Sequence, residues 1–277
     1  MLTFPPIMQR QTYQNLMRNH AQFQSTTGFS LGCFGGLFPY FEVQWVKYIT
    51  RYTIAGKERI RPPRIYKNKV FEDTQSMLVF ILYYLKNNCL QESHAAMFGM
   101  SQPQANLWIN LLKKILLKSL KASKSLPCRD FESLQKFLEA GQDVLIDGSE
   151  RPIPRPSDDE VQKEYYSGKK THTVKNILIT SMIKKVLYLS PTYEGKAHDK
   201  SICDEEQIKF ELPVILWEDL GFIGLNPDNA EVRRPIKKPR KKELDAQQKA
   251  FNRQISSKRV KVEHAIGQCQ NFSNSQR

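Results

Sequence analysis

This sequence of 277 residues has no membrane-spanning apolar run, no apolar core of a signal peptide and no CxxC motif. No run approaches the roughly 18 apolar residues that a membrane span needs, and the start, MLTFPPIMQRQTYQ, has no apolar core of signal-peptide length. The five cysteines are odd in number and never spaced as CxxC, which gives little support to a disulfide framework or a zinc cluster. We therefore expect an intracellular protein with reduced thiols and no membrane partner.

Acidic residues are scarce relative to basic ones. The chain has 42 Lys and Arg against 28 Asp and Glu, a formal net charge of +14, which favours a polyanion as partner. Basic residues gather in RRPIKKPRKK, residues 233–242. A solvated basic loop or a nuclear-import signal would explain this run as well as contacts with phosphates would. The candidates for phosphate contacts are Arg233, Arg234, Lys237 and Lys238.

The first half of the chain is predicted to be helical. An amphipathic segment lies around Leu37–Tyr48, and TQSMLVFILYYL, residues 74–85, is apolar on nearly all sides, as in a buried helix. A short helix over residues 91–99 would end at Gly99. Ser101 is a suitable N-cap for a third, longer helix over residues 102–117.

This third helix has two faces. The apolar residues that recur at helical spacing are Ala105, Trp108, Ile109, Leu112 and Leu116. The polar positions, which are rich in amides, are Gln102, Gln104, Asn106, Asn110 and Lys113. A short helix, a turn and a longer helix with exposed amides are typical of a helix-turn-helix, in which amides can bind an adenine edge. An ordinary helical bundle with a solvated face would show the same pattern.

The second half is predicted to be an α/β domain. After a polar segment, residues 121–134, apolar runs of strand length alternate with helical segments. The predicted strands cover residues 144–146, 173–182, 186–189 and 213–217.

Acidic residues follow two of these strands. VLIDGSE runs into Asp147, and PVILWEDLGF runs into Asp219. Neighbouring strands would bring both to the carboxyl end of one sheet, where α/β folds place their ligands. A third acid, Glu263, lies beside the apolar stripe of the last predicted helix, with Arg259 one turn earlier. Three acids would crowd like charges unless they share a hard cation such as Mg²⁺ or Mn²⁺, although each acid alone would also suit a turn cap or the surface.

Several blocks of the second half resemble the DDE-superfamily endonucleases of bacterial insertion sequences, which are related to the Harbinger type. IDGSERPI, YYSGKKTHTVKN, LSPTYEGKAHDKSI, WEDLGFIG and RVKVEHAIG occur in family order and lie between residues 140 and 267. The segment LYYLKNNCLQESHAAMFGMSQPQANLWI, residues 82–109, is similar to the helix-turn-helix that accompanies this catalytic domain.

The resemblance implies an α/β RNase H-like catalytic domain with a mixed sheet and flanking helices, preceded by an all-α helix-turn-helix region. It implies a transposase that cleaves transposon ends with Mg²⁺, or Mn²⁺ in its place, and transfers the 3′-hydroxyl to target DNA. By motif, the metal ligands are Asp147, Asp219 and Glu263, with Asp199 of AHDK as an alternative second ligand, and Arg259 contacts phosphate near the cut. His172 and His198 are disfavoured as ligands because the carboxylates already suit Mg²⁺. In the second-strand block, the candidate DNA contacts are Lys169, Lys170 and Lys175.

The expected organisation is an N-terminal helical region (1–65), a helix-turn-helix domain (66–120), a linker (121–140) and the endonuclease domain (141–277). The expected partner is double-stranded DNA, both terminal inverted repeats and target site, bound by a homodimer or a larger assembly. The resemblance favours a bacterial cytoplasm over a eukaryotic nucleus. It ends near Gly267, whereas family members continue with a basic helix, so we expect a copy truncated at its C-terminus. The alternative function is a catalytically inactive, truncated or domesticated protein that recognises element ends without cutting.

Overall fold

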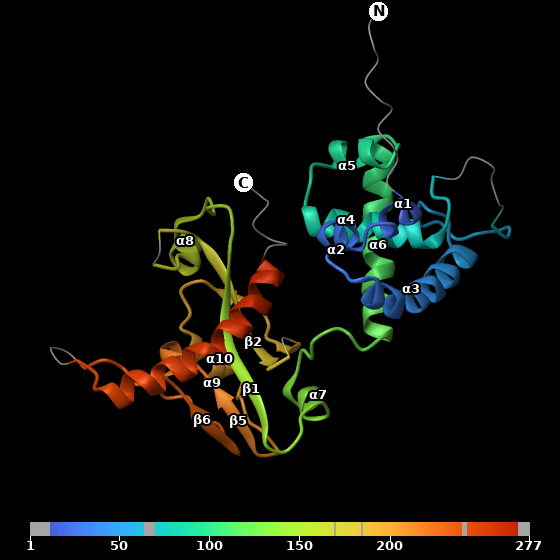
Figure 1. Ribbon diagram of the computed structural model, residues 1–277. Coiled ribbons are helices and arrows are strands. Elements are labelled where there is room, and N and C mark those ends of the chain that lie inside the picture. The colour runs from blue at the N-terminus through green and yellow to red at the C-terminus, as the bar shows by residue number, and fades with distance from the viewer. Residues whose placement is uncertain (1–11, 64–69, 169, 184, 240–242, 271–277) are drawn as a thin grey trace, which may run out of the picture. The chain divides into compact units, whose positions relative to one another are not determined.

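The computed structural model describes residues 12–63, 70–168, 170–183, 185–239 and 243–270, without the side chains of 261–270. The chain forms two compact units, one within residues 12–126 and one over Pro127–Gln270 (Figure 1). Among the helices of these described residues, none is both long and apolar enough to cross a membrane.

The first unit is all helical in its regular structure. Its helices are α1 (Tyr13–Met17), α2 (His20–Thr27), α3 (Leu31–Arg51), α4 (Thr74–Asn87), α5 (Gln91–Met97) and α6 (Gln102–Ala122). The predicted buried helix is confirmed as α4, which the Asp73 side chain caps by accepting a hydrogen bond from the Ser76 amide. The predicted amphipathic segment lies within α3, whose buried residues, Phe34, Leu37, Phe41 and Trp45, recur at helical spacing.

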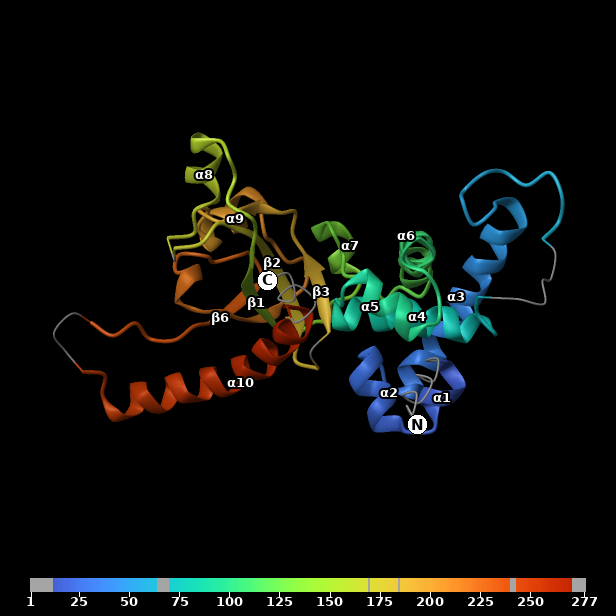
Figure 2. The same cartoon turned by 90° about the horizontal axis from the view of Figure 1, so that it is seen from above.

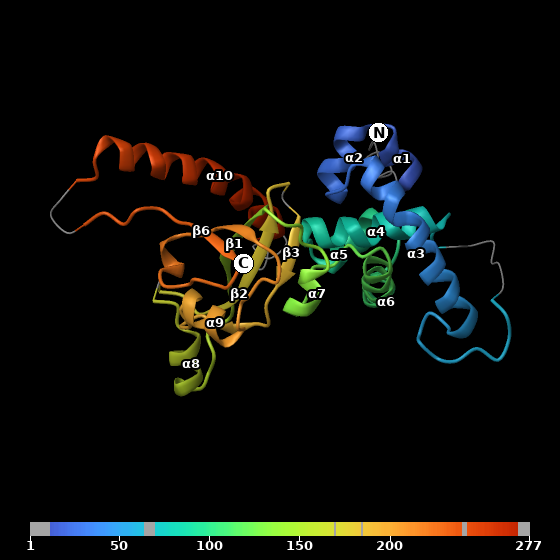
Figure 3. The ribbon, with the colours of Figure 1, turned by 90° about the horizontal axis from the view of Figure 1, so that it is seen from below.

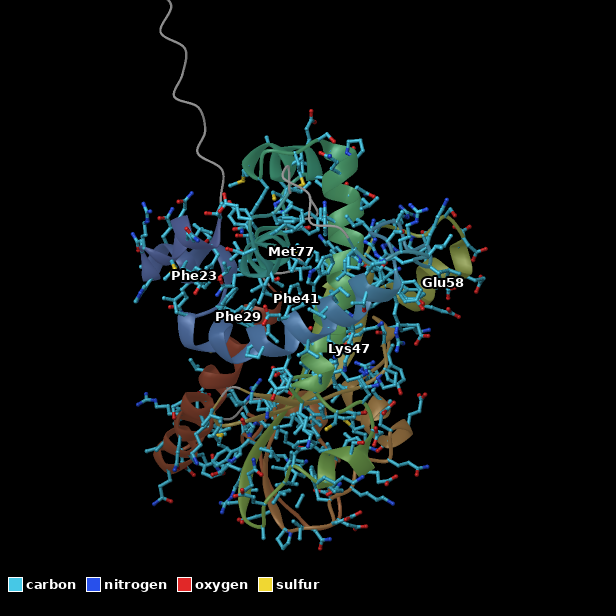
Figure 4. All side chains as sticks on the ribbon, turned by 90° about the vertical axis from the view of Figure 1, so that its right-hand side faces the viewer. Phe23, Phe29, Phe41, Lys47, Glu58 and Met77 are labelled. Atoms are coloured by element: carbon cyan, nitrogen blue, oxygen red, sulfur yellow. The ribbon has the colours of Figure 1, made fainter. Side chains whose placement is uncertain are left out.

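One apolar core holds these helices together. Phe23 of α2 and Phe41 of α3 are fully buried, and Met77 of α4 packs against the same cluster (Figure 4). The burial of such large side chains removes apolar surface from water at about 25 cal/mol per Å². Helices far apart in sequence therefore share a single hydrophobic core in this unit.

Helices α5 and α6 are joined by a tight turn. Gly99 adopts a left-handed backbone with φ of 65°, a conformation that favours glycine. Ser101 and Gln104 then form a capping box at the start of α6. The apolar face predicted for this helix is buried, and α6 runs beyond the predicted residue 117 because Ser119 continues that face and bonds back to the Ile115 carbonyl.

His94 of α5 is buried in an aromatic cage. Its ring lies 4.3 Å from that of Phe80, 4.8 Å from Phe98 and 5.2 Å from Tyr84 between centroids. Within the described part of the chain neither ring nitrogen has a hydrogen-bond partner. Burial lowers the pKa of His94 to about 4, because the cage cannot solvate an imidazolium ion.

The second unit is a six-stranded mixed sheet with flanking helices. Its strands are β1 (Gln142–Pro152), β2 (Thr173–Ser181), β3 (Val186–Leu189), β4 (Tyr193–Glu194), β5 (Val214–Trp217) and β6 (Ala230–Arg233). The order is β3-β2-β1-β5-β6, with β4 beside β2. The pairs β1–β2 and β2–β3 are antiparallel, whereas β1–β5 and β5–β6 are parallel. The helical elements are α7 (Phe131–Gln135), α8 (Asp159–Tyr165), α9 (Asp199–Glu205), the 3₁₀ turn η1 (Leu220–Phe222) and α10 (Ala246–Gln270).

Helices cover both faces of this sheet. Figures 2 and 3 show α10 along one face and α9 on the other. Val144 and Ile146 of β1 belong to the larger core, together with Ile202 of α9. Leu145, between them, points the opposite way and packs with Ile255 of α10. The alternation thus directs Val144 and Ile146 toward the core shared with α9, and Leu145 toward α10.

Strand β1 corrects one sequence prediction. The apolar run was expected to end as a strand before Asp147, but β1 continues through Pro152, and Asp147 pairs with Leu178 of β2. The expectation was wrong because main-chain pairing with the long strand β2 extends β1 past Asp147.

The buried imidazole predicts an acid-sensitive first unit. In the unfolded chain His94 takes up a proton near its ordinary pKa of 6.5, whereas in the folded protein it does so only near pH 4. Stability should therefore fall as pH drops through this window, by about 3 kcal/mol in total. Urea unfolding at pH 7.0, 5.5 and 4.5 would measure the free energy of unfolding of the native protein and of His94→Leu. The variant should lose less stability than the native protein as the pH falls.

The exposed His20 provides the control. His20→Leu should follow the native pH dependence. Parallel stability curves for His94→Leu and the native protein would contradict a depressed pKa in the cage.

Candidate active site

Asp147 and Asp219 come together through the pairing of β1 with β5. The parallel register ends at the pair Leu145–Trp217, and each aspartate lies two residues further along its strand direction. Asp219 keeps an extended backbone, with φ of −100° and ψ of −175°. Because side chains alternate along extended chains, both carboxylates lie on the face that carries Leu145 and Trp217.

Helix α10 packs on this same face. Ile255, 1% exposed, forms a small apolar cluster with Leu145 and Trp217. The Lys258 ammonium lies 4.1 Å from the centroid of the Trp217 ring, a cation–π contact. The Trp217 indole in turn donates a 2.5 Å hydrogen bond to Asp143 Oδ1. Apolar packing and one aromatic side chain therefore fix the rotation of α10 over the strands.

This rotation directs Arg259 toward the acids. Its guanidinium lies 3.5 Å from Asp219 Oδ2, and the two side chains are 21% and 32% exposed. The guanidinium also acts on Asp147 through its charge. The sequence prediction that Arg259 and the two aspartates belong to one site thus corresponds to a cluster in the structure.

Asp147 carries unfavourable negative charge. Burial is the main cause that raises its pKa, and Arg259 opposes the rise. The charges of Asp219 and Asp199 raise the pKa further, while the Gly148 amide lowers it by a 2.9 Å hydrogen bond. The net pKa is about 6. A cation would stabilise this carboxylate, since it would offset both burial and the neighbouring charges.

Asp199 also lies at this site, at the start of α9. A Cβ atom added to Gly148 would come within 2.9 Å of Asp199 Oδ1, and one added to Gly221 within 3.0 Å of Asp199 Oδ2. The structure therefore brings Asp147, Asp219, Asp199 and Arg259 together. Glu263 falls within α10, but its side chain is outside the described residues.

The chemistry of these donors fits a hard divalent cation. In the described part of the chain, no three His, Cys, Asp or Glu side chains form a closed metal cluster. Asp147 and Asp219 nevertheless offer only carboxylate oxygens, and burial together with the neighbouring acids raises the pKa of Asp147. Mg²⁺ binds well to few carboxylates because it retains water ligands. His198 is the N-cap residue of α9, without a capping hydrogen bond from its side chain, and His172 packs edge-on to the Tyr166 ring.

A buried ion pair adjoins the acids. The Glu218 side chain is 0% exposed, and Arg234 Nε lies 3.1 Å from its Oε1. Burial raises the pKa of Glu218 to about 7; Arg234 opposes this rise and Asp219 adds to it. The Glu218 amide also donates a hydrogen bond to the Arg233 carbonyl. The start of the basic segment is thus fastened beside Asp219.

The other basic candidates of this segment differ in environment. Arg233 is paired with Glu231, and Lys238 with Glu243. Lys237 is exposed.

The lysines of the second-strand block have different positions. Lys170 precedes β2 in an exposed turn with φ of 61°. Lys175 is 7% exposed, and its ammonium donates a 2.8 Å hydrogen bond to the Ala197 carbonyl. Lys169 is outside the described residues.

The amides predicted on α6 form a connected chain. Gln102 and Asn106 both donate to Gln91 Oε1, at 3.1 and 2.9 Å, and Asn110 donates to Asn106 Oδ1 at 3.1 Å. Gln104 is used in the capping box, and Lys113 is exposed. Gln91, at the start of α5, joins the two helices through this network.

Sequence reasoning missed three of these residues. The spacing of Lys258 from Ile255 could have placed it on the face of α10 that packs on the sheet. Nothing local indicated that Glu218 is buried or that Gln91 contacts α6, because both depend on partners distant in sequence.

Comparisons with known proteins agree with this geometry. The family model described as DDE superfamily endonuclease matches residues 146–276. This match passes Gly267, so the expectation that the resemblance ends there was wrong. The chain is 26% identical over 222 residues to the "Probable transposase for insertion sequence element IS702" of Microchaete diplosiphon, covering 80% of this chain and 77% of that protein. No solved structure matches the chain. Residues 146–276 are therefore similar to the DDE superfamily endonucleases, in a chain similar to an insertion-sequence transposase.

Proposed function

We propose that this protein is a DNA transposase that cleaves the ends of its element and transfers the freed 3′-hydroxyl to target DNA. The observation that carries the proposal is the placement of Asp147 and Asp219 on one face at the end of the β1–β5 pairing, with Arg259 beside them. The similarity to the IS702 transposase supports the same function.

The sheet supports an RNase H-like fold. Three antiparallel strands, β3-β2-β1, continue into two parallel strands, β5 and β6, and helices cover both faces. In this proposal β1 and β5 each supply one acid and α10 supplies the third, Glu263. The division of the chain at residues 65, 120 and 140 belongs to the same proposal.

The catalytic roles follow from the contacts. Asp147 and Asp219, with Glu263, would hold Mg²⁺, with Mn²⁺ as a substitute and Asp199 as the alternative second ligand. Such an ion supplies activation of the attacking oxygen and stabilisation of the leaving one. Main-chain pairing holds Asp147 within β1 and holds β5 up to Trp217, two residues before Asp219. This limits the displacement of the two aspartates, and even about 1 Å of misplacement can slow a reaction by orders of magnitude. Arg259 would orient a phosphate close to Asp219.

DNA recognition is assigned to the first unit. Helices α5 and α6 would act as a helix-turn-helix whose amide chain reads base edges in the major groove. Lys170, Lys237 and Lys238 would contact phosphates. Because two element ends must be joined, we infer a homodimer or larger assembly acting on DNA in a bacterial cytoplasm.

Asp147→Asn tests the enzyme assignment. The variant should lose cleavage of DNA carrying the element's own ends in Mg²⁺ or Mn²⁺, yet still bind that DNA. In EDTA at pH 8 it should be more stable than the native protein by about 1 to 3 kcal/mol, because the neutral amide avoids a buried charge. Nicking assays, gel shifts and urea unfolding measure the three effects.

Asp159→Asn, an exposed acid of α8, is the matched control and should change none of them. End binding without cleavage by the native protein would instead support the alternative, a catalytically inactive DNA-binding protein.

Asn106→Ala tests the amide chain, since Asn106 connects Gln91 with Asn110. Loss of a bidentate base contact should reduce the preference for end DNA over scrambled DNA by about 1 to 3 kcal/mol. The salt dependence of binding should stay unchanged, because no phosphate contact is removed. Fluorescence anisotropy at several salt concentrations measures both quantities.

Gln24→Ala removes an exposed amide of α2 in the same unit and is the control. An equal loss of affinity for both DNAs in Asn106→Ala would argue against base recognition by this face.

A further inference from the structure

Lys175 places a positive charge inside the second unit, beside the acids. We propose that Lys175 is a positioning residue: its ammonium holds the Asp199 carboxylate between Gly148 and Gly221 and thereby fixes the spacing of Asp147 and Asp219. The catalytic consequence rests on the proposed function, whereas the placement of Asp199 can be tested without it.

The surroundings of Lys175 define its role. Its side chain is 9% exposed, and Nζ lies 3.0 Å from Asp199 Oδ1 and 3.7 Å from Glu150 Oε1. Nζ also donates a 2.8 Å hydrogen bond to the Ala197 carbonyl. An ammonium group has three protons to donate, and a buried one must be matched by such acceptors. The charge of Lys175 is therefore directed inward, toward Asp199 and the segment that leads into α9.

Asp199 fills the space between the two segments that carry the other acids. Gly148 follows Asp147 directly, and its added Cβ would lie 2.9 Å from Asp199 Oδ1. The added Cβ of Gly221, two residues after Asp219, would lie 3.0 Å from Asp199 Oδ2. Real Cβ atoms essentially never approach other atoms more closely than 3.0 Å. A side chain at position 148 would therefore have to displace the Asp199 carboxylate, which occupies that space.

Charge explains why Lys175 is needed for this arrangement. Asp199 would repel Asp147 and Asp219 if its charge were unbalanced, as its effect on Asp147 shows. The ion pair with Lys175 balances that charge. Asp199 can then act as a spacer, and Asp147 and Asp219 keep their charges for a cation. This separates Asp199 in role from the two aspartates beside it.

Removal of each charge of the Lys175–Asp199 pair, with Mn²⁺ affinity as the readout, tests the proposal. Mn²⁺ affinity can be measured without DNA from the electron paramagnetic resonance signal of free Mn²⁺, on the full chain. Lys175→Met should bind Mn²⁺ at least about threefold more tightly, since the charge of Asp199 is released, while cleavage turnover falls at least about tenfold. Asp199→Asn should bind Mn²⁺ at least about threefold more weakly. The double variant, with charge balance restored, should return to within about twofold of the native affinity.

The diagnostic result is that Mn²⁺ affinity rises in Lys175→Met and falls in Asp199→Asn. A merely structural role would weaken Mn²⁺ binding in both single variants, and that outcome would overturn the proposal. Lys163→Met, an exposed lysine of α8, is the control and should leave both affinity and turnover unchanged.

A stability cycle tests the geometry without any metal. In EDTA, Gly148→Ala should lower the thermal midpoint by at least about 3 °C in the native background and by clearly less in an Asp199→Ala background. Equal losses in the two backgrounds would overturn the proposed placement of Asp199. Absence of Mn²⁺ binding by the native protein, with this coupling intact, would count against the proposed function and the catalytic role of Lys175, while the spacer role of Asp199 would stand.

Discussion

The parallel pairing of β1 with β5 is the constraint on which the rest of the site depends. It sets Asp147 and Asp219 at matching positions, each two residues beyond the last pair of the register, Leu145–Trp217. The same pairing places Leu145 beside Trp217, and these two form the apolar surface on which Ile255 of α10 packs. One register therefore determines both the separation of the acids and the docking of the helix that carries Arg259.

This arrangement concentrates unfavourable electrostatics at one edge of the sheet. The buried charged residues of the described chain, Lys175 and Glu218, both lie in the second unit beside the strand ends. Each is matched by an opposite charge, Asp199 or Arg234, whereas Asp147 is balanced only in part by Arg259. Such partial balance lowers the stability of the fold and is typical of sites that act on a ligand.

Much of the fold could be predicted from the sequence, because local patterns determine it. The apolar runs at residues 186–189 and 213–217 became β3 and β5, and the faces of α6 follow from helical spacing. Interactions between distant segments could not be predicted. The continuation of β1 past Asp147 depends on β2, and the burial of Lys175 depends on Ala197 and Asp199, which lie on another segment. An alternating pattern gives the face of a strand but not what covers that face.

Strand β6 determines where in the structure the basic segment begins, which the sequence alone did not predict. Because β6 is parallel to β5, with Arg233 opposite Trp217, the chain leaves the sheet at the same edge as Asp219. The buried pair of Glu218 and Arg234 fastens it there. Phosphates held by this segment would lie next to the acids, although acids alone would repel them. The fold thus resolves two opposing demands of the proposed reaction, a negative site for a cation and a positive approach for DNA, by using neighbouring strands of one sheet.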